Sequence, residues 1–109
     1  MLLTVRERLI LLSILPQEGD FLTLKVLRKL QENLGFSEDE FARYKFENLA
    51  DGRVKWDNAE EQDKEVELGR KATEIIVTAL TKLNDQKKLK LEHYDLYGRF
   101  VEPEEDKDA

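Results

Sequence analysis

The sequence predicts a mainly α-helical protein with one small β-hairpin, folded as a compact bundle of about five helices. Charged residues make up 39% of the 109 residues, and there are only five glycines and two prolines. That composition is typical of helices with solvated outer faces. Apolar residues recur at helical spacings over most of the chain. One segment departs from this helical pattern: a short alternating run, Arg53 to Asp57, follows an Asp-Gly turn signal.

The first helix is expected over 4–15. Thr4 and Glu7 have the spacing of a capping box, in which each side chain satisfies a free backbone N–H at the helix start. The turns that follow are apolar nearly all round, which predicts burial on several sides. Pro16 then ends the helix, because proline cannot continue it.

The second helix is expected over 21–34, with Asp20 as its N-cap. Gly35 stands where a left-handed residue would end the helix. The predicted buried stripe follows spacings of three and four residues and consists of Phe21, Leu24, Leu27, Leu30 and Leu34.

A short third helix is expected over 38–44, because Ser37 and Glu40 form a second capping box. Phe36 and Phe41 occupy the positions of a hydrophobic staple around that cap. Three acids in the first turn suit the positive end of the helix dipole.

A two-stranded hairpin is expected near 45–57, between helices three and four. Phe46, Val54 and Trp56 would share one face of it, and Asp51-Gly52 would supply the turn. An isolated hairpin is only marginally stable, so it must dock. We expect Trp56 to anchor it to the helices.

The fourth helix is expected to begin at Asp57 or Asn58 and to contain Gly69 in its interior. The last is expected over 89–101, with its aromatic stripe in the core. Together these elements predict a single domain, 1–101, followed by a disordered acidic tail, 102–109. The predicted stripe of the fourth helix is Leu68, Ala72, Ile75, Ile76, Ala79, Leu80 and Leu83, and that of the last is Leu89, Tyr94, Tyr97, Phe100 and Val101.

The charge of the chain argues against nonspecific nucleic-acid binding. The net charge is −6, and the last eight residues hold five acids and one lysine, so the body carries only −2. Cysteine is absent, which excludes disulfides, thiol nucleophiles and thiolate metal sites. The apolar run over 9–15 is too short for a membrane span and is not followed by a small-residue cleavage site. A cytoplasmic protein is therefore expected.

No catalytic or metal-binding pattern is visible. Glu92 and Asp95 flank His93, but such neighbours do not converge on one helix face, so His93 is expected to be a surface residue. The five glycines are isolated, which excludes a phosphate-binding loop, and no serine lies in a nucleophile elbow. We expect no enzyme activity, no cofactor, no metal and no small-molecule ligand.

Two functions from different classes remain. The first is a protein-binding or assembly module that self-associates, because we expect the chain to carry more apolar surface than one copy can bury. Its candidate interaction residues are Arg53, Lys55, Trp56, Tyr94, Tyr97 and Phe100.

The second is a nucleic-acid-binding regulator, because three helices followed by a hairpin is the order of a winged helix. Acids in the first turn of the presumed recognition helix, Glu38 to Glu40, would oppose phosphates, so nucleic acid is the less favoured partner. The candidate contacts of this alternative are Lys25, Arg28, Lys29, Lys87, Lys88 and Lys90.

The chain also resembles small uncharacterised proteins encoded by tailed phages and prophages. The likeness covers most of residues 2–101 and is carried by an apolar helix and turn ending in "LPQEG", the strand "GRVKWD" and a late "LY--F" pattern at Leu96, Tyr97 and Phe100. Because these are packing motifs, the resemblance assigns no activity and no functional residue. It does imply a bacterial host cytoplasm as the setting.

Overall fold

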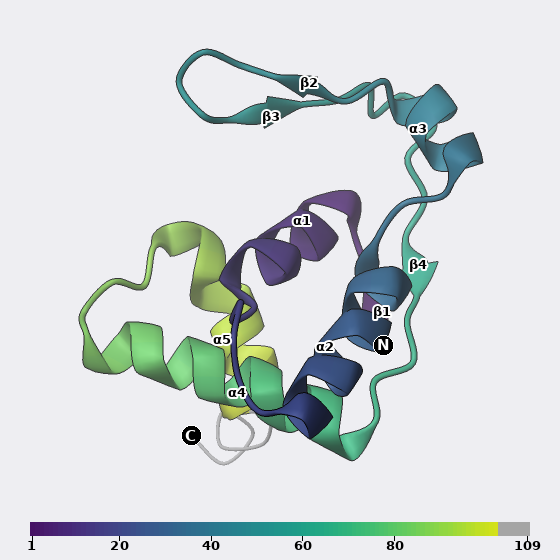
Figure 1. Ribbon diagram of the computed structural model, residues 1–109. Helices are drawn as coiled ribbons and strands as arrows, with labels where there is room; N and C mark the ends of the chain where they lie inside the picture. Colours follow the sequence, from purple (N-terminus) through teal and green to yellow (C-terminus); the bar gives the residue numbers. More distant parts are fainter. Residues whose placement is uncertain (103–109) are drawn as a thin grey trace.

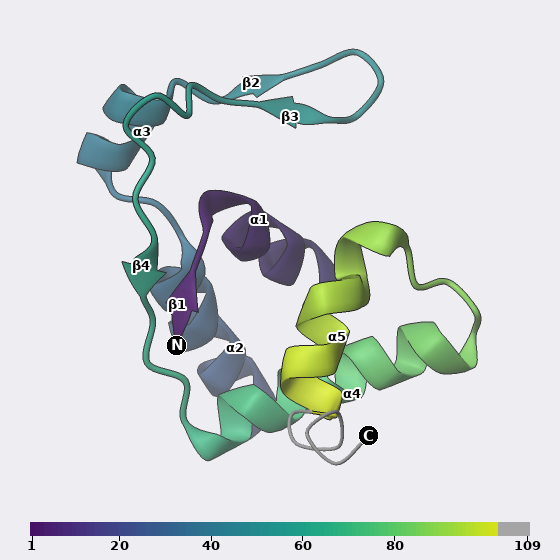
Figure 2. The same ribbon diagram turned by 180° about the vertical axis from the view of Figure 1, so that it is seen from behind.

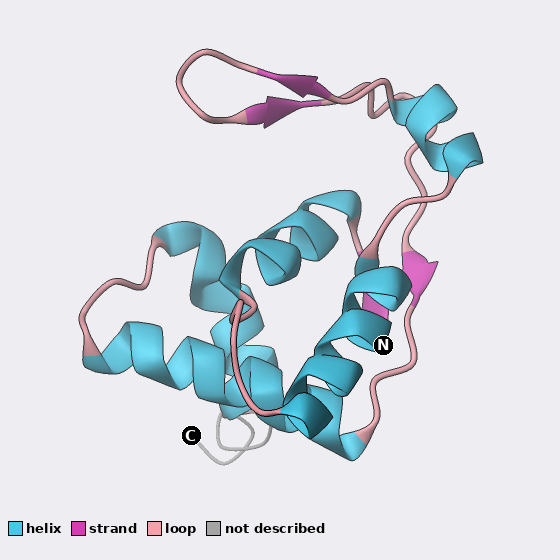
Figure 3. Ribbon diagram, in the orientation of Figure 1, coloured by secondary structure: helices cyan, strands magenta, loops and turns pink. Residues whose placement is uncertain are grey.

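The computed structural model describes residues 1–102, so the predicted acidic tail lies outside the described residues beyond Glu102. The fold is mainly α-helical with small antiparallel strand pairs, as predicted (Figure 3). The elements are β1 (Leu2–Leu3), α1 (Val5–Ile14), α2 (Phe21–Leu34), α3 (Glu38–Tyr44), β2 (Glu47–Asn48), β3 (Val54–Lys55), β4 (Lys64–Glu65), α4 (Arg70–Asp85), the 3-10 turn η1 (Leu91–His93) and α5 (Tyr94–Val101).

Four helices form the bundle. α4 contacts α1, α2 and α5, and α1 also contacts α2. Figure 1 shows α2 on the near side of this bundle, whereas the reverse view in Figure 2 shows α5 on the near side. The core between them is aliphatic apart from one phenylalanine, and it contains Leu3, Ile10, Leu11, Leu15, Leu27, Leu30, Leu34, Val66, Ile76, Leu80, Leu96 and Phe100.

The predicted helix starts are confirmed in the first three helices. Thr4 Oγ1 accepts the Glu7 N–H at 3.0 Å, and Glu7 Oε1 accepts the Thr4 N–H at 2.9 Å. Asp20 Oδ1 accepts the Thr23 N–H at 2.8 Å. Ser37 and Glu40 form the reciprocal pair at the start of α3. These contacts satisfy N–H groups that have no partner within their helices.

The prediction of a left-handed Gly35 is wrong. Its φ is −68° and its ψ is −179°, which is extended backbone open to any residue. Glycine is needed here for space instead, because an added Cβ would lie 2.9 Å from the carbonyl oxygen of Gln31. The chain therefore leaves α2 straight toward α3.

The predicted start of the fourth helix is also wrong. Residues 57–69 contain no helix, and β4 within them pairs antiparallel with β1, Leu2 opposite Glu65 and Leu3 opposite Lys64. The alternating residues after β4 place Val66 in the core, where its N–H donates to the Met1 carbonyl at 2.9 Å. Gly69 is the N-cap of α4 rather than an interior residue.

The last helix is shorter than predicted because η1 precedes it. A 3-10 turn has three residues per turn rather than 3.6, so the 89–101 stripe does not stay on one face. Tyr94 is therefore exposed, whereas Leu96 and Phe100 are buried. Leu89, Tyr97 and Val101 pack at the edge of the core.

Candidate interaction surfaces

Residues 36–62 form an arm that leaves the bundle after α2 and returns at β4. It consists of α3, the β2–β3 hairpin and their connections, and it stands away from the bundle in both views (Figures 1 and 2). The hairpin pairs Glu47 with Lys55 and Asn48 with Val54. Gly52, with a φ of +88°, supplies the left-handed turn residue that the sequence predicted.

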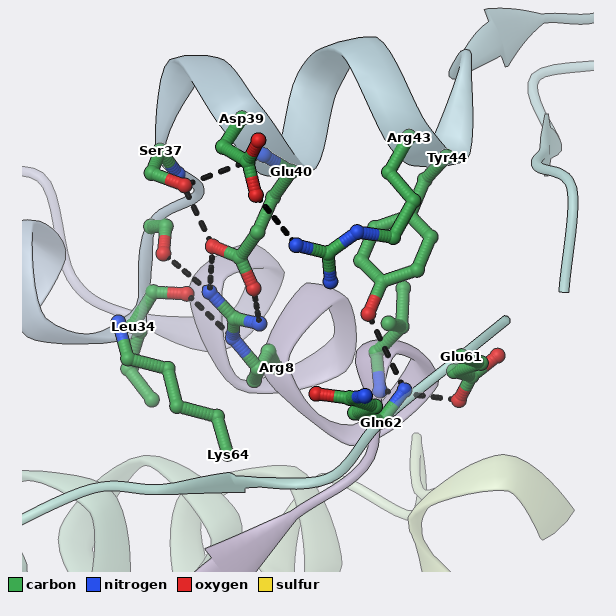
Figure 4. Close-up of polar contacts among 12 residues, drawn as sticks. Arg8, Leu34, Ser37, Asp39, Glu40, Arg43, Tyr44, Glu61, Gln62 and Lys64 are labelled. Atoms are coloured by element: carbon green, nitrogen blue, oxygen red, sulfur yellow. Dashed lines mark hydrogen bonds and ion pairs between the residues drawn. The ribbon is translucent and has the colours of Figure 1, made fainter.

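Arg8 of α1 holds the base of the arm (Figure 4). Its side chain is fully buried, and its Nε donates to the Leu34 carbonyl at 3.1 Å while Nη2 donates to the Gly35 carbonyl. The guanidinium also donates to both carboxylate oxygens of Glu40 in α3, from Nη1 to Oε2 at 2.7 Å and from Nη2 to Oε1 at 3.1 Å. Arg8 thus closes the carbonyl end of α2 and binds the first turn of α3 at the same time.

The Arg8 guanidinium lies over the ring of Phe36, 3.9 Å from its centroid, which adds a cation–π contact. Hydrogen bonding from Arg8, with a further bond from the Ser37 N–H, lowers the pKa of Glu40 to about 2 against the opposing effect of partial burial. Glu40 is therefore ionised throughout the physiological range, and the contact is a permanent ion pair.

An aromatic cluster continues from this base to the hairpin. Phe46 is central to it, with its ring centroid 4.7 Å from that of Phe36, 5.9 Å from Tyr44 and 6.3 Å from Trp56. Phe36 and Phe41 lie 6.1 Å apart, as the staple predicted. These distances and tilts are those of favourable aromatic pairs. Trp56 therefore connects the hairpin to the helix α3 through Phe46.

Glu61 connects the same cluster to the bundle. Its Oε1 accepts the Trp56 indole N–H at 2.9 Å, and its Oε2 accepts the backbone N–H of Val5, in the first turn of α1, at 3.3 Å. Nearby, the Tyr44 hydroxyl accepts the Gln62 N–H at 3.2 Å (Figure 4). The arm is thus attached to α1 at two places, through Arg8 and through Glu61.

The predicted interaction residues divide between two parts of the molecule. Arg53, Lys55 and Trp56 lie on the arm, where Arg53 pairs with Asp51 at 2.7 Å and Trp56 is half-buried. The α5 residues lie on the bundle, where only Tyr94 is freely exposed. Tyr97 is half-buried and its hydroxyl accepts from Asn84, and Phe100 belongs to the core.

A surface that the sequence did not predict lies at the start of α2. We call Phe21, Leu22 and Leu24 the α2 tip; their exposed fractions are 77%, 58% and 41%. The spacing argument fails here because Phe21 precedes Leu27 by six residues, a rotation of about 240° at 3.6 residues per turn. Phe21 therefore points away from the face that buries Leu27.

The α2 tip is bordered by bases. Lys25, Arg28 and Lys29 are all exposed on α2, and Lys25 Nζ lies 5.7 Å from the centroid of the Phe21 ring. The Nε of Arg28 lies 3.8 Å from the Oε2 of Glu32. The second basic set of the sequence, Lys87, Lys88 and Lys90, is also exposed but lies in the turn between α4 and η1.

A cavity of about 360 Å³ lies between α1 and the start of α5, and we call it the α1–α5 groove. Ile10 and Leu96 supply its apolar floor, and Leu91, 92% exposed, stands at its edge next to the exposed Tyr94. The remaining lining is polar and mostly acidic and consists of Thr4, Arg6, Glu7, Glu92 and Asp95.

His93 is buried, contrary to the sequence-based expectation. Its Nδ1 accepts the backbone N–H of Lys90 at 2.9 Å, so it helps to close η1. Within residues 1–102, no three His, Asp or Glu side chains come together in a way that could hold a metal ion. No helix in that part of the chain is both long and apolar enough to cross a membrane.

The chain matches no family model, no curated protein and no solved structure.

Proposed function

We propose that the protein is a non-enzymatic protein-binding or assembly module of the phage or prophage type. The observation that carries this proposal is the exposure of large apolar side chains at two places, Phe21 and Leu22 on the α2 tip and Leu91 and Tyr94 beside the α1–α5 groove. Burying one such side chain is worth about 1.5–3 kcal/mol. Grouped exposed apolar residues of this kind commonly mark protein interfaces.

The arm supports the same proposal. Its base is held by the Arg8–Glu40 pair and its hairpin by the Trp56–Phe46 contact, so the hairpin is presented in a defined position. A preorganised element loses less conformational entropy when a partner binds it. The phage or prophage setting is supported by the sequence resemblance alone.

The test compares binding by wild-type and variant chains. The chain is immobilised and exposed to a lysate of the organism that encodes it, together with two variants, Phe21→Ser with Leu22→Ser and Leu91→Ser with Tyr94→Ser. We expect wild type to retain proteins, or further copies of itself, that at least one variant loses. Gln31→Ser, an exposed polar change on α2, is the matched control. Identical retention by all four chains would refute the proposal.

A nucleic-acid-binding regulator is the second candidate. The observations that favour it are the three helices followed by a projecting hairpin and the exposed Lys25, Arg28 and Lys29. Exposed Glu38 and Asp39 on α3 would oppose phosphates. This candidate predicts DNA binding that weakens steeply with salt. It is rejected if duplex DNA shows no mobility shift at low ionic strength.

A further inference from the structure

The two apolar surfaces are complementary in charge. The α2 tip is accompanied by the exposed bases Lys25 and Lys29, and the α1–α5 groove by the acids Glu92 and Asp95. We propose that copies of this chain assemble head to tail, with the α2 tip of one copy seated in the α1–α5 groove of the next. This inference rests on the proposed function and names the partner as a second copy.

The apolar parts of the two surfaces also correspond. The tip projects an aromatic ring and two leucines into solvent, and the groove carries the exposed Leu91 at its edge with the buried core residues Ile10 and Leu96 beneath. A volume of about 360 Å³ lies in the range of about 300–1,000 Å³ in which proteins hold small ligands. Phe21 is the natural occupant, because large aromatic side chains in pockets dominate interface energies.

The charges that surround these apolar parts favour this pairing over others. Asp95 has no ion-pair partner among residues 1–102, and Glu92 meets only His93, at 3.8 Å. Both acids are thus open to Lys25 and Lys29 of a neighbour. Glu7 of the lining is already paired with Arg99, at 2.8 Å. Arg6, the one base of the groove, can meet Glu18, which is exposed just before the tip.

The placement of the two surfaces determines the type of assembly. α2 lies on the near side of the bundle in Figure 1, and α5 lies on the near side in the reverse view of Figure 2. A contact between unlike surfaces is heterologous, so a contact between α2 of one copy and the groove beside α5 of the next continues into a ring or a filament. A two-fold pairing of tips would instead bring the lysines of both copies together, which is unfavourable.

The experiment uses two variants that each remove one surface. The tip variant is Phe21→Ser with Leu22→Ser, and the groove variant is Glu92→Lys with Asp95→Lys. In sedimentation velocity from low to high micromolar concentration, we expect wild type to form species larger than a dimer. Each variant alone should sediment as a single chain. Their mixture should form a complex of two chains that does not grow, because one intact tip meets one intact groove.

One control repeats the charge reversal elsewhere, and the other introduces a serine on α2 outside the tip. Glu60→Lys with Asp63→Lys repeats the charge reversal at exposed residues, and Gln31→Ser lies on α2 beyond the tip; both should assemble as wild type does. Circular dichroism of every variant checks the fold. The inference is overturned if wild type stays a single chain, if either variant still assembles, or if the mixture forms no complex. A wild type that stays single but still retains other proteins would leave the proposed function standing.

Discussion

The guanidinium of Arg8 on α1 is paired through two nitrogens with the carboxylate of Glu40 on α3. The same guanidinium satisfies two carbonyls at the end of α2, so one buried side chain joins three helices. No buried polar side-chain atom within residues 1–102 is left without a hydrogen-bond partner. The charge at the base of the arm is therefore fully compensated. Removal of one partner is expected to lower the stability of the fold strongly.

Arg8→Ala should destabilise the protein by about 3–5 kcal/mol, because breaking a buried pair leaves the other partner and its hydrogen-bonding groups uncompensated. Urea denaturation followed by circular dichroism measures the change. Arg43→Ala, which removes the surface partner of Asp39 on α3, is the control and should change stability little. Equal losses of stability in the two variants would show that the contacts of Arg8 contribute no more than a surface ion pair does.

Acid should weaken the protein through Glu40. Its pKa falls from the ordinary 4.5 to about 2 in the folded chain, so its contribution is complete above the ordinary pKa and disappears as the pH falls through the folded value. Urea midpoints measured from pH 6 down to pH 2 should therefore decline over this window. In Glu40→Gln the decline should be smaller, although the variant is less stable at neutral pH. Parallel pH profiles for the two proteins would contradict this assignment.

Glu61→Ala should loosen the arm without unfolding the bundle. The substitution removes the acceptor of the Trp56 indole N–H and of the Val5 N–H, at a cost of about 1–3 kcal/mol for groups left without a partner. Because Trp56 is the only tryptophan, its fluorescence reports on the arm alone and should shift to longer wavelength. Glu60→Ala, one residue earlier and exposed, should leave the emission unchanged. An unshifted Glu61→Ala spectrum would rule out this anchoring role.

Two glycines should respond to alanine in opposite directions. Gly35→Ala places a Cβ 2.9 Å from a backbone carbonyl and should cost about 1–3 kcal/mol through crowding. Gly98→Ala meets nothing within 4 Å inside α5, so it should add about 0.4–1 kcal/mol by favouring the helix. Thermal denaturation of both variants checks the signs. A stable Gly35→Ala protein would mean that the end of α2 can shift freely.

The elements that the sequence predicts correctly are those whose signals are local. Thr4 with Glu7, Asp20 and Ser37 with Glu40 each mark a helix start through contacts within three residues, and all three starts were confirmed. The hairpin was also predicted, because Gly52 and the alternating residues around it are a local pattern. Capping and turn chemistry depend on immediate neighbours, so no tertiary information is needed.

The errors concern features that depend on distant parts of the chain. The polar run after Trp56 suits a helix, but within it residues 64–65 pair as a strand with residues 2–3. The burial of Arg8 depends on Glu40, 32 residues away. The exposure of Phe21 is different, because it follows from the position of Phe21 around α2 rather than from a contact with a distant residue. The signal available for Phe21 was its angle to Leu27 around α2.

The β1–β4 pair has a consequence for biosynthesis. Leu2 is synthesised before its strand partner Glu65, which follows about 60 residues later; at about 5–20 residues per second that interval is roughly 3–12 s. During that interval the apolar α1 segment has no α4 to pack against. The β1–β4 pair and the packing of α1 against α4 can therefore form only after the segment over 64–85 has been synthesised.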